Sequence, residues 1–240
     1  MTILPTLDLL AFGYFVLAWA CYATVVERGW RKRDGGLSAR MHQYREVWMR
    51  RALLREVRIV DIQIIASLQN GTAFFASTTL LAVGGALTLL RSTGEALSVV
   101  TSLPFGIHTT PEQWEIKCTG LIVIFIYAFF KFAWAYRLFN YVAIMVGAMP
   151  PASDGHTAEA ETHVLRTAGL FRAAGQHFNR GQRAFFLALG YLGWFAGPLV
   201  LLVSTTAVVV VMWRRQFGSA AQRALMSKLP GKWEPKKQGP

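Results

Sequence analysis

The chain has 240 residues, of which 53% are hydrophobic and only 16% are charged, and its formal net charge is +12. Soluble domains usually carry about 25% charged residues, so this composition argues against a soluble globular protein. The charges fall in blocks between long uncharged stretches, as expected where an ionised side chain is costly to bury in hydrocarbon. A nucleic-acid-binding role is also excluded as the first interpretation, because the basic blocks adjoin apolar runs instead of covering a soluble face.

Four apolar runs reach the length of about 20 residues that a transmembrane helix needs. They cover about residues 3–26, 62–90, 116–145 and 184–213. Trp30, Trp114 and Trp213 lie near their ends, where amphipathic rings favour the membrane interface. We therefore predict an all-α integral membrane protein with four transmembrane helices in one domain, residues 1–217. Residues 218–240 contain Pro, Gly and Lys and are predicted to form a basic, disordered tail.

Basic residues concentrate between the first two spans, where residues 27–61 hold ten Arg and Lys. Such an excess in a short loop marks the cytoplasmic side of a membrane. We therefore expect an inner-membrane, multi-pass protein with its N-terminus outside and with residues 27–61 and 150–183 in the cytoplasm. The basic tail conflicts with this orientation, because four spans would place it outside. An odd number of spans would resolve the conflict, but the sequence shows no fifth apolar run.

Both cytoplasmic segments carry helical patterns. No Gly or Pro occurs between Ser38 and Asn70, and apolar residues recur there at helical spacing, which predicts a long cytoplasmic helical extension of the second span. A weaker apolar stripe from Val164 to Phe178 predicts an amphipathic helix before the fourth span. It would either lie in the membrane interface or pack on the long cytoplasmic helix. Three arginines on another face of the first segment are candidate ligands for lipid headgroups: Arg51, Arg55 and Arg58.

Polar residues in or near the spans are candidates for function, because the membrane makes them costly. Those at the inner ends of the last three spans are expected to form one polar cluster that faces the cytoplasm. For the amides the structural alternative is hydrogen bonding between helices. For Lys131 it is an ion pair with Asp61. Both structural alternatives are favoured over a functional role. The candidate cluster comprises Asp61, Gln69, Asn70, Lys131, Arg137, Asn140, Asn179 and Arg183.

The sequence offers no set of residues for a metal, a cofactor or catalysis. Cys21 and Cys118 have no metal-ligand spacing, and the five histidines all lie outside the span interiors. A haem held by two histidines inside the membrane is therefore not expected. There is no glycine-rich phosphate loop and no visible pair of nucleophile and base. We therefore predict no cofactor, no metal and no catalytic residues, and favour a non-enzymatic role while leaving an enzymatic one open.

Three segments resemble one family: Ser67-Leu-Gln-Asn-Gly-Thr-Ala-Phe-Phe-Ala-Ser77, Phe130-Lys-Phe-Ala-Trp-Ala-Tyr-Arg-Leu-Phe-Asn-Tyr141 and Phe178-Asn-Arg-Gly-Gln-Arg-Ala-Phe-Phe186. They are similar to the family called domain of unknown function 599, and the likeness extends to about Phe217. It implies a small multi-pass membrane protein with no established activity. The family's second-span motif often reads Leu-Arg-Asn, whereas Gln69 precedes Asn70 here, which weakens a charge-based role for that patch. The resemblance directs attention to Asn70, Arg137, Asn140, Asn179 and Arg183.

Three functions remain open at this point. The first is a non-enzymatic membrane protein that forms a homo-oligomer or serves as an accessory subunit of a membrane complex, and that contacts anionic lipids or a partner. The second is a channel or transporter for a small, anionic solute, with Lys131, Arg137 and Arg183 lining a cytoplasmic vestibule. The third is a membrane enzyme acting on lipid, which ranks last because no catalytic set is visible.

Overall fold

The computed structural model describes residues 4–31, 37–102 and 109–226, and every regular element in these ranges is a helix. The helices are α1 (Thr6–Arg31), α2 (Leu37–Leu53), α3 (Ile59–Arg91), α4 (Thr93–Ser102), α5 (Pro111–Gly147), η1 (Ala152–Asp154), α6 (Ala158–Tyr191), η2 (Leu192–Ala196), α7 (Pro198–Phe217) and α8 (Ala220–Met226). Four segments are long and apolar enough to cross a membrane: Thr6–Glu27, Ile59–Arg91, Pro111–Gly147 and Pro198–Leu225. The all-α prediction with four such helices is confirmed.

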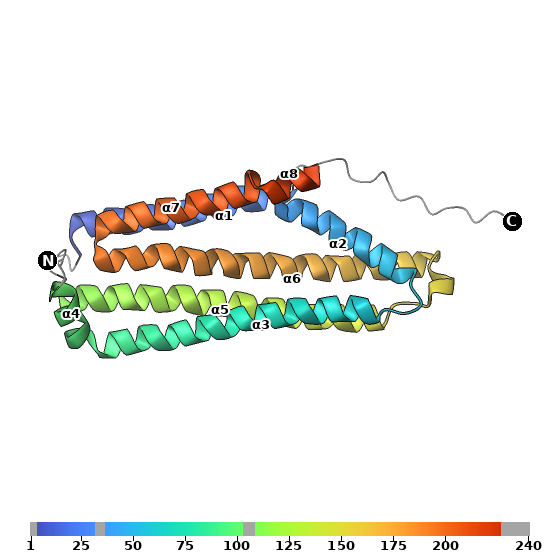
Figure 1. The fold of residues 1–240 in the computed structure, drawn as a ribbon, viewed down its shortest axis with the longest axis horizontal. Coiled ribbons are helices and arrows are strands. Elements are labelled where there is room, and N and C mark those ends of the chain that lie inside the picture. The colour runs from blue at the N-terminus through green and yellow to red at the C-terminus, as the bar shows by residue number, and fades with distance from the viewer. Residues whose placement is uncertain (1–3, 32–36, 103–108, 227–240) are drawn as a thin grey trace.

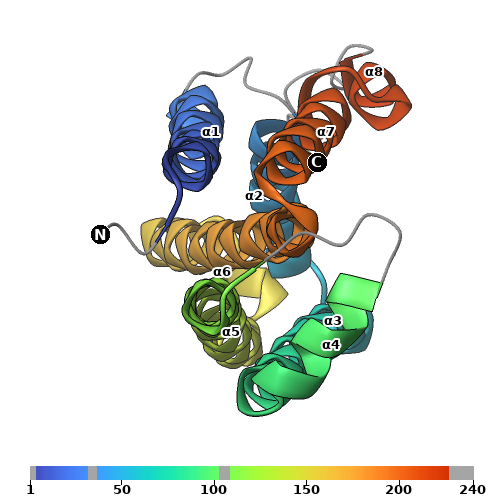
Figure 2. The same cartoon turned by 90° about the vertical axis from the view of Figure 1, so that its left-hand side faces the viewer.

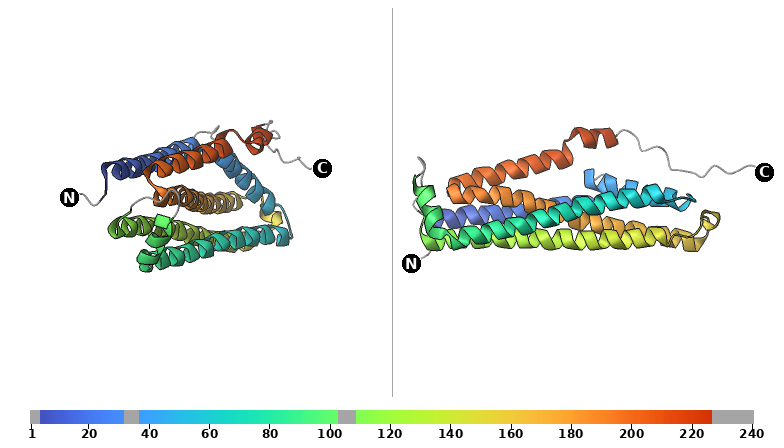
Figure 3. Two further views of the ribbon diagram at one scale, coloured as in Figure 1. Left: turned by 60° about the vertical axis from the view of Figure 1, so that its left-hand side comes forward. Right: turned by 60° about the horizontal axis from the view of Figure 1, so that its bottom comes forward.

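The long helices lie side by side in an elongated bundle, in which α3, α5, α6 and α7 alternate in direction while α1 runs parallel to α7 (Figure 1). Viewed along the bundle, α6 occupies the middle, with α1 and α7 on one side of it and α5 on the other (Figure 2). The helix α3 lies at the edge and packs chiefly on α5 (Figure 3). This arrangement leaves much of α3 exposed, whereas α6 is covered by its neighbours.

The bundle is held together by buried residues that repeat every three or four positions along α5. This spacing averages 3.5 residues, the period that packs neighbouring helices as in a coiled coil. On α3 the residues that meet α5 are Ile65, Thr72, Thr79 and Ala86, spaced by sevens and mostly small, which permits close approach. On α5 the series is Trp114, Cys118, Leu121, Phe125, Ala128, Phe132, Ala135, Phe139, Val142 and Val146.

The predicted fourth span, residues 184–213, is not one helix. Its first part ends α6, the chain turns through η2, and α7 begins at Pro198 and runs back antiparallel to α6. Gly197 sits at the turn with φ 124° and ψ 165°, a conformation open almost only to glycine, and Pro198 then starts the new helix. The apolar run therefore covers two half-length segments joined by a sharp reversal.

The predicted continuous extension from Ser38 into the second span is also interrupted. The chain leaves α2 at Leu53, reverses, and enters α3 at Ile59, although neither Gly nor Pro marks the break. Arg58 explains it: its guanidinium donates hydrogen bonds to the carbonyls of Ala52 (2.9 Å), Leu53 (3.2 Å) and Pro150 (2.7 Å). These bonds satisfy the carbonyls left open where α2 ends.

The amphipathic helix predicted at Val164–Phe178 is the first half of α6, and it packs on α2 and α5. Phe171 lies between Trp48 (ring centroids 5.2 Å apart) and Phe139 (5.8 Å), and the Arg45 guanidinium covers the same ring. Burial lowers the pKa of Arg45 to about 10. Burial, together with the charges of Arg45 and Arg172, lowers the pKa of His42 to about 4. His42 is therefore neutral at pH 7 beside the α2–α6 contact.

The predicted disordered tail begins with a helix instead, because α8 occupies Ala220–Met226. Gln222 is buried there, and the Leu225 carbonyl accepts a hydrogen bond from Arg40 of α2 (3.5 Å). The rest of that predicted tail, residues 227–240, and Ile3 at the start of the predicted first span lie outside the described residues.

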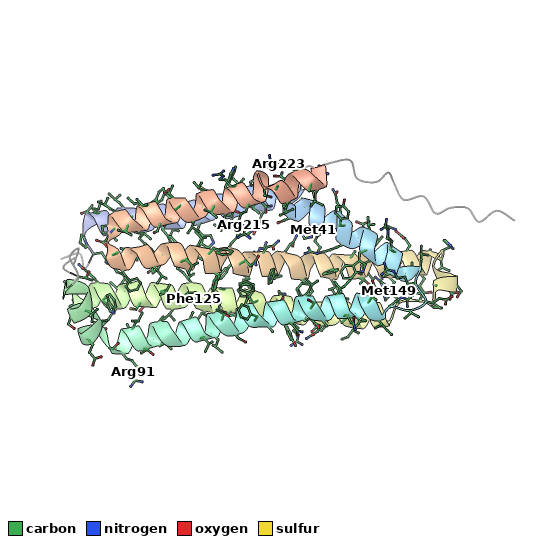
Figure 4. All side chains as sticks on the ribbon, in the orientation of Figure 1. Met41, Arg91, Phe125, Met149, Arg215 and Arg223 are labelled. Carbon is green, nitrogen blue, oxygen red and sulfur yellow. The ribbon has the colours of Figure 1, made fainter. Side chains whose placement is uncertain are left out.

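The reversal at Gly197 changes where the basic residues lie. Because α7 runs back toward α2, Arg215 and Arg223 lie toward the α2 end of the bundle, away from Arg91 (Figure 4). In the described part of the chain, the opposite end holds two basic residues, Arg91 and the buried Lys117. The basic residues of α2, of the first half of α6 and of the end of α7 therefore share one end.

Candidate functional site

The eight residues of the predicted cluster do not meet in one place. Gln69 donates a hydrogen bond to Asn140 (2.6 Å), which confirms an interhelical amide bond between α3 and α5. Asn179 and Arg183 line a cavity between other helices, described below. Asn70 is exposed on α3.

The predicted ion pair between Lys131 and Asp61 is wrong. The fully buried Asp61 accepts a hydrogen bond from Trp48 (2.6 Å) and pairs with Arg55, because the α2–α3 reversal brings those residues over it. Lys131 instead lies over the Tyr127 ring, 5.0 Å from its centroid.

Arg137, also expected in the cluster, is exposed on α5, and its Nε donates to the Tyr141 hydroxyl (2.7 Å).

The most developed polar site lies where α1, α2, α6 and α7 meet. It is an open cavity of about 310 Å³. Its polar lining combines two arginines, two serines, a tyrosine and three side-chain amides, and its apolar lining includes a phenylalanine and a methionine. The lining residues are Tyr22, Val26, Leu37, Ser38, Asn179, Gln182, Arg183, Phe186, Met212, Arg215, Gln216, Ser219 and Ala221. We call it the α1–α7 pocket.

The segment from Phe178 to Arg183 forms one wall of this pocket, and its residues point in different directions. Asn179, Gln182 and Arg183 face the cavity, one helical turn apart. Gly181 faces the other way, where an added Cβ would lie 2.8 Å from the Phe132 ring, so only glycine lets α5 and α6 approach this closely. The segment therefore couples the packing of α5 on α6 to the shape of the pocket.

Glu27, at the end of the first apolar run, holds the arginines of this wall. Its Oε1 accepts hydrogen bonds from Arg180 Nε (2.8 Å) and from Arg183 Nη2 (3.2 Å). Arg183 is only 8% exposed, so its charge is largely withdrawn from water. One carboxylate faces two guanidinium groups here, and Arg215 adds a third, 5.7 Å from the Phe186 ring centroid. Positive charges therefore outnumber negative charges at the pocket.

The opposite wall is organised by hydroxyl and amide groups. Ser38 donates to Gln216 (3.2 Å) and accepts from Asn179 (3.5 Å), which ties α2, α6 and α7 together. None of the lining residues is His, Cys, Asp or Glu, so the pocket holds neither a metal-ligand set nor a general base for Ser38. Within the described ranges, no group of three or more His, Cys, Asp or Glu could hold a metal ion. The arrangement suits binding of an anion with an apolar portion.

Sequence reasoning found Asn179 and Arg183 but missed Glu27, Ser38 and Arg215 at this site. Glu27 gave a usable signal, because it ends the first span at the depth of the motif arginines and is the nearest acid to them. Arg215 gave none, because a four-span reading placed it on the opposite side of the membrane.

A second buried polar site, also missed, joins α1, α5 and η2 at the other end. Asp8 Oδ1 accepts a hydrogen bond from Trp194 Nε1 (2.6 Å) and lies 3.8 Å from Lys117 Nζ. Asp8 is 8% exposed and Lys117 3%. Tyr191 donates to the Lys117 carbonyl (3.1 Å). This site links α1 to α5 and to η2.

The three candidate lipid ligands differ in surroundings. Arg58 is engaged with backbone carbonyls and Arg55 with Asp61, while Arg51 is exposed at the end of α2. Arg55 and Asp61 also line a cavity of about 400 Å³ together with Trp48, Val57, Val60 and Ile64. Two of the three arginines therefore stabilise the α2–α3 reversal.

Comparison with known proteins identifies a family and no closer relative. The model of the family described as "Protein of unknown function, DUF599" matches residues 10–221. No curated protein and no solved structure matches the chain. The match spans α1 to α8 and includes both walls of the α1–α7 pocket. The chain is therefore a member of the DUF599 family.

Proposed function

We propose that this protein is a non-enzymatic integral membrane protein that binds the headgroup of an anionic phospholipid in its α1–α7 pocket. The observation that carries the proposal is the nearly buried Arg183, held at the wall of an open, positively balanced pocket beside Arg215. Guanidinium groups bind phosphate through two parallel hydrogen bonds, which makes arginine well suited to phosphodiester groups. The apolar Phe186 and Met212 offer a surface for the start of an acyl chain.

The two ion-pair sites of α1, the buried Asp8–Lys117 pair and the partly exposed pairs of Glu27, support a placement of the membrane between them. Asp8 marks one level of α1 and Glu27 the other, and the rise between them is about 29 Å at 1.5 Å per residue. The hydrocarbon core of a bilayer is about 30 Å thick. With each pair at one border, the pocket lies at the headgroup level of one leaflet, where a phosphate would reach it.

In this placement the chain crosses the membrane five times. The second half of α6 is the additional crossing, shielded by α1, α5 and α7, so its Arg180 and Arg183 meet Glu27 instead of lipid. An odd number of crossings puts both basic ends, α2 and the end of α7, on the same side. The excess of Arg and Lys then assigns that side to the cytoplasm, which makes the lipid one of the inner leaflet, where anionic headgroups attract basic residues.

A labelling experiment tests the five crossings. In a Cys21→Ala background, which keeps the buried Cys118, a single cysteine is introduced by Glu95→Cys on α4 or by Ala220→Cys on α8. A membrane-impermeant maleimide should label the Glu95→Cys variant in intact cells and the Ala220→Cys variant only after the membrane is opened. Labelling of both variants in intact cells would instead support four crossings and would overturn this placement.

Lipid binding is tested by a matched pair of substitutions on neighbouring residues of α7. Arg215 lines the pocket and Arg214 does not, yet both are exposed arginines in the last turn. Arg215→Gln should weaken retention of phosphatidylglycerol over phosphatidylcholine by about tenfold, since a charge-assisted phosphate contact is worth about 1.5–3 kcal/mol. Arg214→Gln should change it by less than twofold. Native mass spectrometry of the purified protein, exchanged into each lipid, measures the difference.

Equal losses in the two variants would show that basic residues attract lipid without a specific pocket, and no loss in either would reject the site.

The transport hypothesis finds less support in the geometry. Lys131 and Arg137, its proposed lining residues, lie beside tyrosines on α5 and do not line the cavity that Arg183 lines.

A further inference from the structure

We infer that α3 is the contact helix of a homodimer, and that its outward face packs against the same face of a second copy of this chain. This face is the side of α3 opposite the residues that meet α5. It comprises Gln63, Asn70, Phe74, Ser77, Leu81 and Gly84, which recur at steps of three, four or seven and are all exposed. The proposal is independent of the α1–α7 pocket, to which α3 contributes no residue.

The outward face of α3 carries polar side chains in its membrane-spanning part and exposed apolar side chains at its cytoplasmic end. In the membrane-spanning part, the outward side carries the Ser77 hydroxyl, and Asn70 follows about two turns nearer the cytoplasm. In the described part of the chain neither side chain bonds to another group. Beyond the membrane, Ile59 and Val60 on the same side are 65% and 63% exposed. Asn70 and Ser77 in the span, and Ile59 and Val60 at its cytoplasmic end, are groups that a facing helix would cover.

Glycines on this face have no explanation within one copy. An added Cβ at Gly84 or Gly85 would meet nothing within 4 Å. Without side chains at these two successive positions, a facing helix can approach the backbone of α3 closely. Phe74 and Leu81, 67% and 78% exposed, stand between the small residues. They form knobs of the size that Ser77 and Gly84 of a facing helix would accommodate.

A second copy of the chain is the occupant that fits. All copies share one orientation in a membrane, so a two-fold axis along its normal pairs α3 with α3 in parallel and at equal depth. Serine hydroxyls and asparagine amides both donate and accept, so like residues satisfy one another across such an axis. At 33 residues α3 is about 50 Å long, and with a width of about 10 Å it would bury on the order of 1,000 Å² in total. That area reaches the size of specific interfaces.

Cysteine crosslinking in native membranes tests the face. In a Cys21→Ala background, Ser77→Cys is compared with Leu80→Cys, which lies at nearly the same depth and is also exposed but points about 60° away along the helix surface. Mild oxidation should convert most of the Ser77→Cys variant to a disulfide-linked dimer, at least fivefold more than Leu80→Cys. Equal crosslinking of the two, or none in either, would overturn the proposed face.

A substitution that leaves the single copy intact provides the second measurement. Gly84→Leu should shift the purified protein from dimer to monomer by at least tenfold in dissociation constant, measured by native mass spectrometry, and should not lower the melting temperature of the monomer. Gly13→Leu on α1 is the control, because an added Cβ there also meets nothing within 4 Å, and it should leave the dimer unaffected. A Gly84→Leu variant that dimerises as strongly as the control would reject the inference, whatever lipid binding shows.

Discussion

Replacing Lys117 with methionine is expected to lower the free energy of unfolding by about 3–5 kcal/mol, because it leaves the buried Asp8 carboxylate without its cation. Asp8 is 8% exposed and keeps only the Trp194 indole N–H as a hydrogen-bond partner once Lys117 is gone. The loss should loosen α1 from α5 and η2 together. Denaturant unfolding in detergent, followed by tryptophan fluorescence, measures it, and Trp194 at the site serves as one reporter.

Two controls separate the ion pair from a general loss of charge. Arg91→Met removes a basic residue at the same end, but Arg91 is exposed, so its effect should stay within about 0.5 kcal/mol. The double variant Asp8→Leu with Lys117→Met removes both charges and should be more stable than Lys117→Met alone, because no unpaired charge remains. If Lys117→Met were no more damaging than Arg91→Met, the pair would not be what joins these segments.

The sequence was sufficient to predict an all-α chain with four helices long and apolar enough to cross a membrane, but not every boundary between helices. The series of buried residues along α5 is visible in the sequence as a regular alternation of three and four, and it accounts for how α5 packs on α3 and α6. Such periodicity is local, so it survives without knowledge of the tertiary structure. The same periodicity marks α5 as a helix that packs on neighbours along its whole length.

The reversal at Gly197 was not predicted because hydropathy records composition and not direction. Residues 184–196 are apolar but fewer than the about 20 that a span needs, and Pro198 follows after one glycine. A hairpin of two shorter segments and one kinked helix therefore have the same hydropathy profile. The basic tail was the informative signal, since the end of α7 lies at the α2 end of the bundle once the chain reverses.

The sequence gives the position of a candidate residue along its helix but not the direction in which its side chain points. Arg183 lies at the level of Glu27, to which it donates a hydrogen bond. Sequence position does not determine which neighbouring helix a side chain faces. Lys131 and Arg137 lie on another side of the bundle, beside tyrosines of α5. The α2–α3 reversal had the same effect on Asp61, because a hairpin brought Arg55 closer to it than any residue of another span.

The two ion-pair sites of α1, one buried and one partly exposed, share one physical logic. Asp8 with Lys117 at one end and Glu27 with Arg180 and Arg183 at the other each tie α1 to helices that it meets far along the chain. An isolated charge at these levels would be expensive to keep out of water, so each pair stabilises one vertical position of α1 against α5 and α6. Register of α1 in turn sets the opening of the α1–α7 pocket, because Tyr22 and Val26 line it.

Gly197→Ala is expected to destabilise the protein by about 1–3 kcal/mol, because alanine cannot adopt φ 124° and ψ 165° without steric strain. Gly197 ends η2 and begins α7, so the strain falls on the hinge of the α6–α7 hairpin. It should also displace Met212 and Arg215 and thereby weaken lipid retention. Gly169→Ala on α6 is the matched control, since an added Cβ there meets nothing within 4 Å, and it should raise stability by up to about 1 kcal/mol. Equal melting temperatures for the two variants would mean that the reversal does not depend on Gly197.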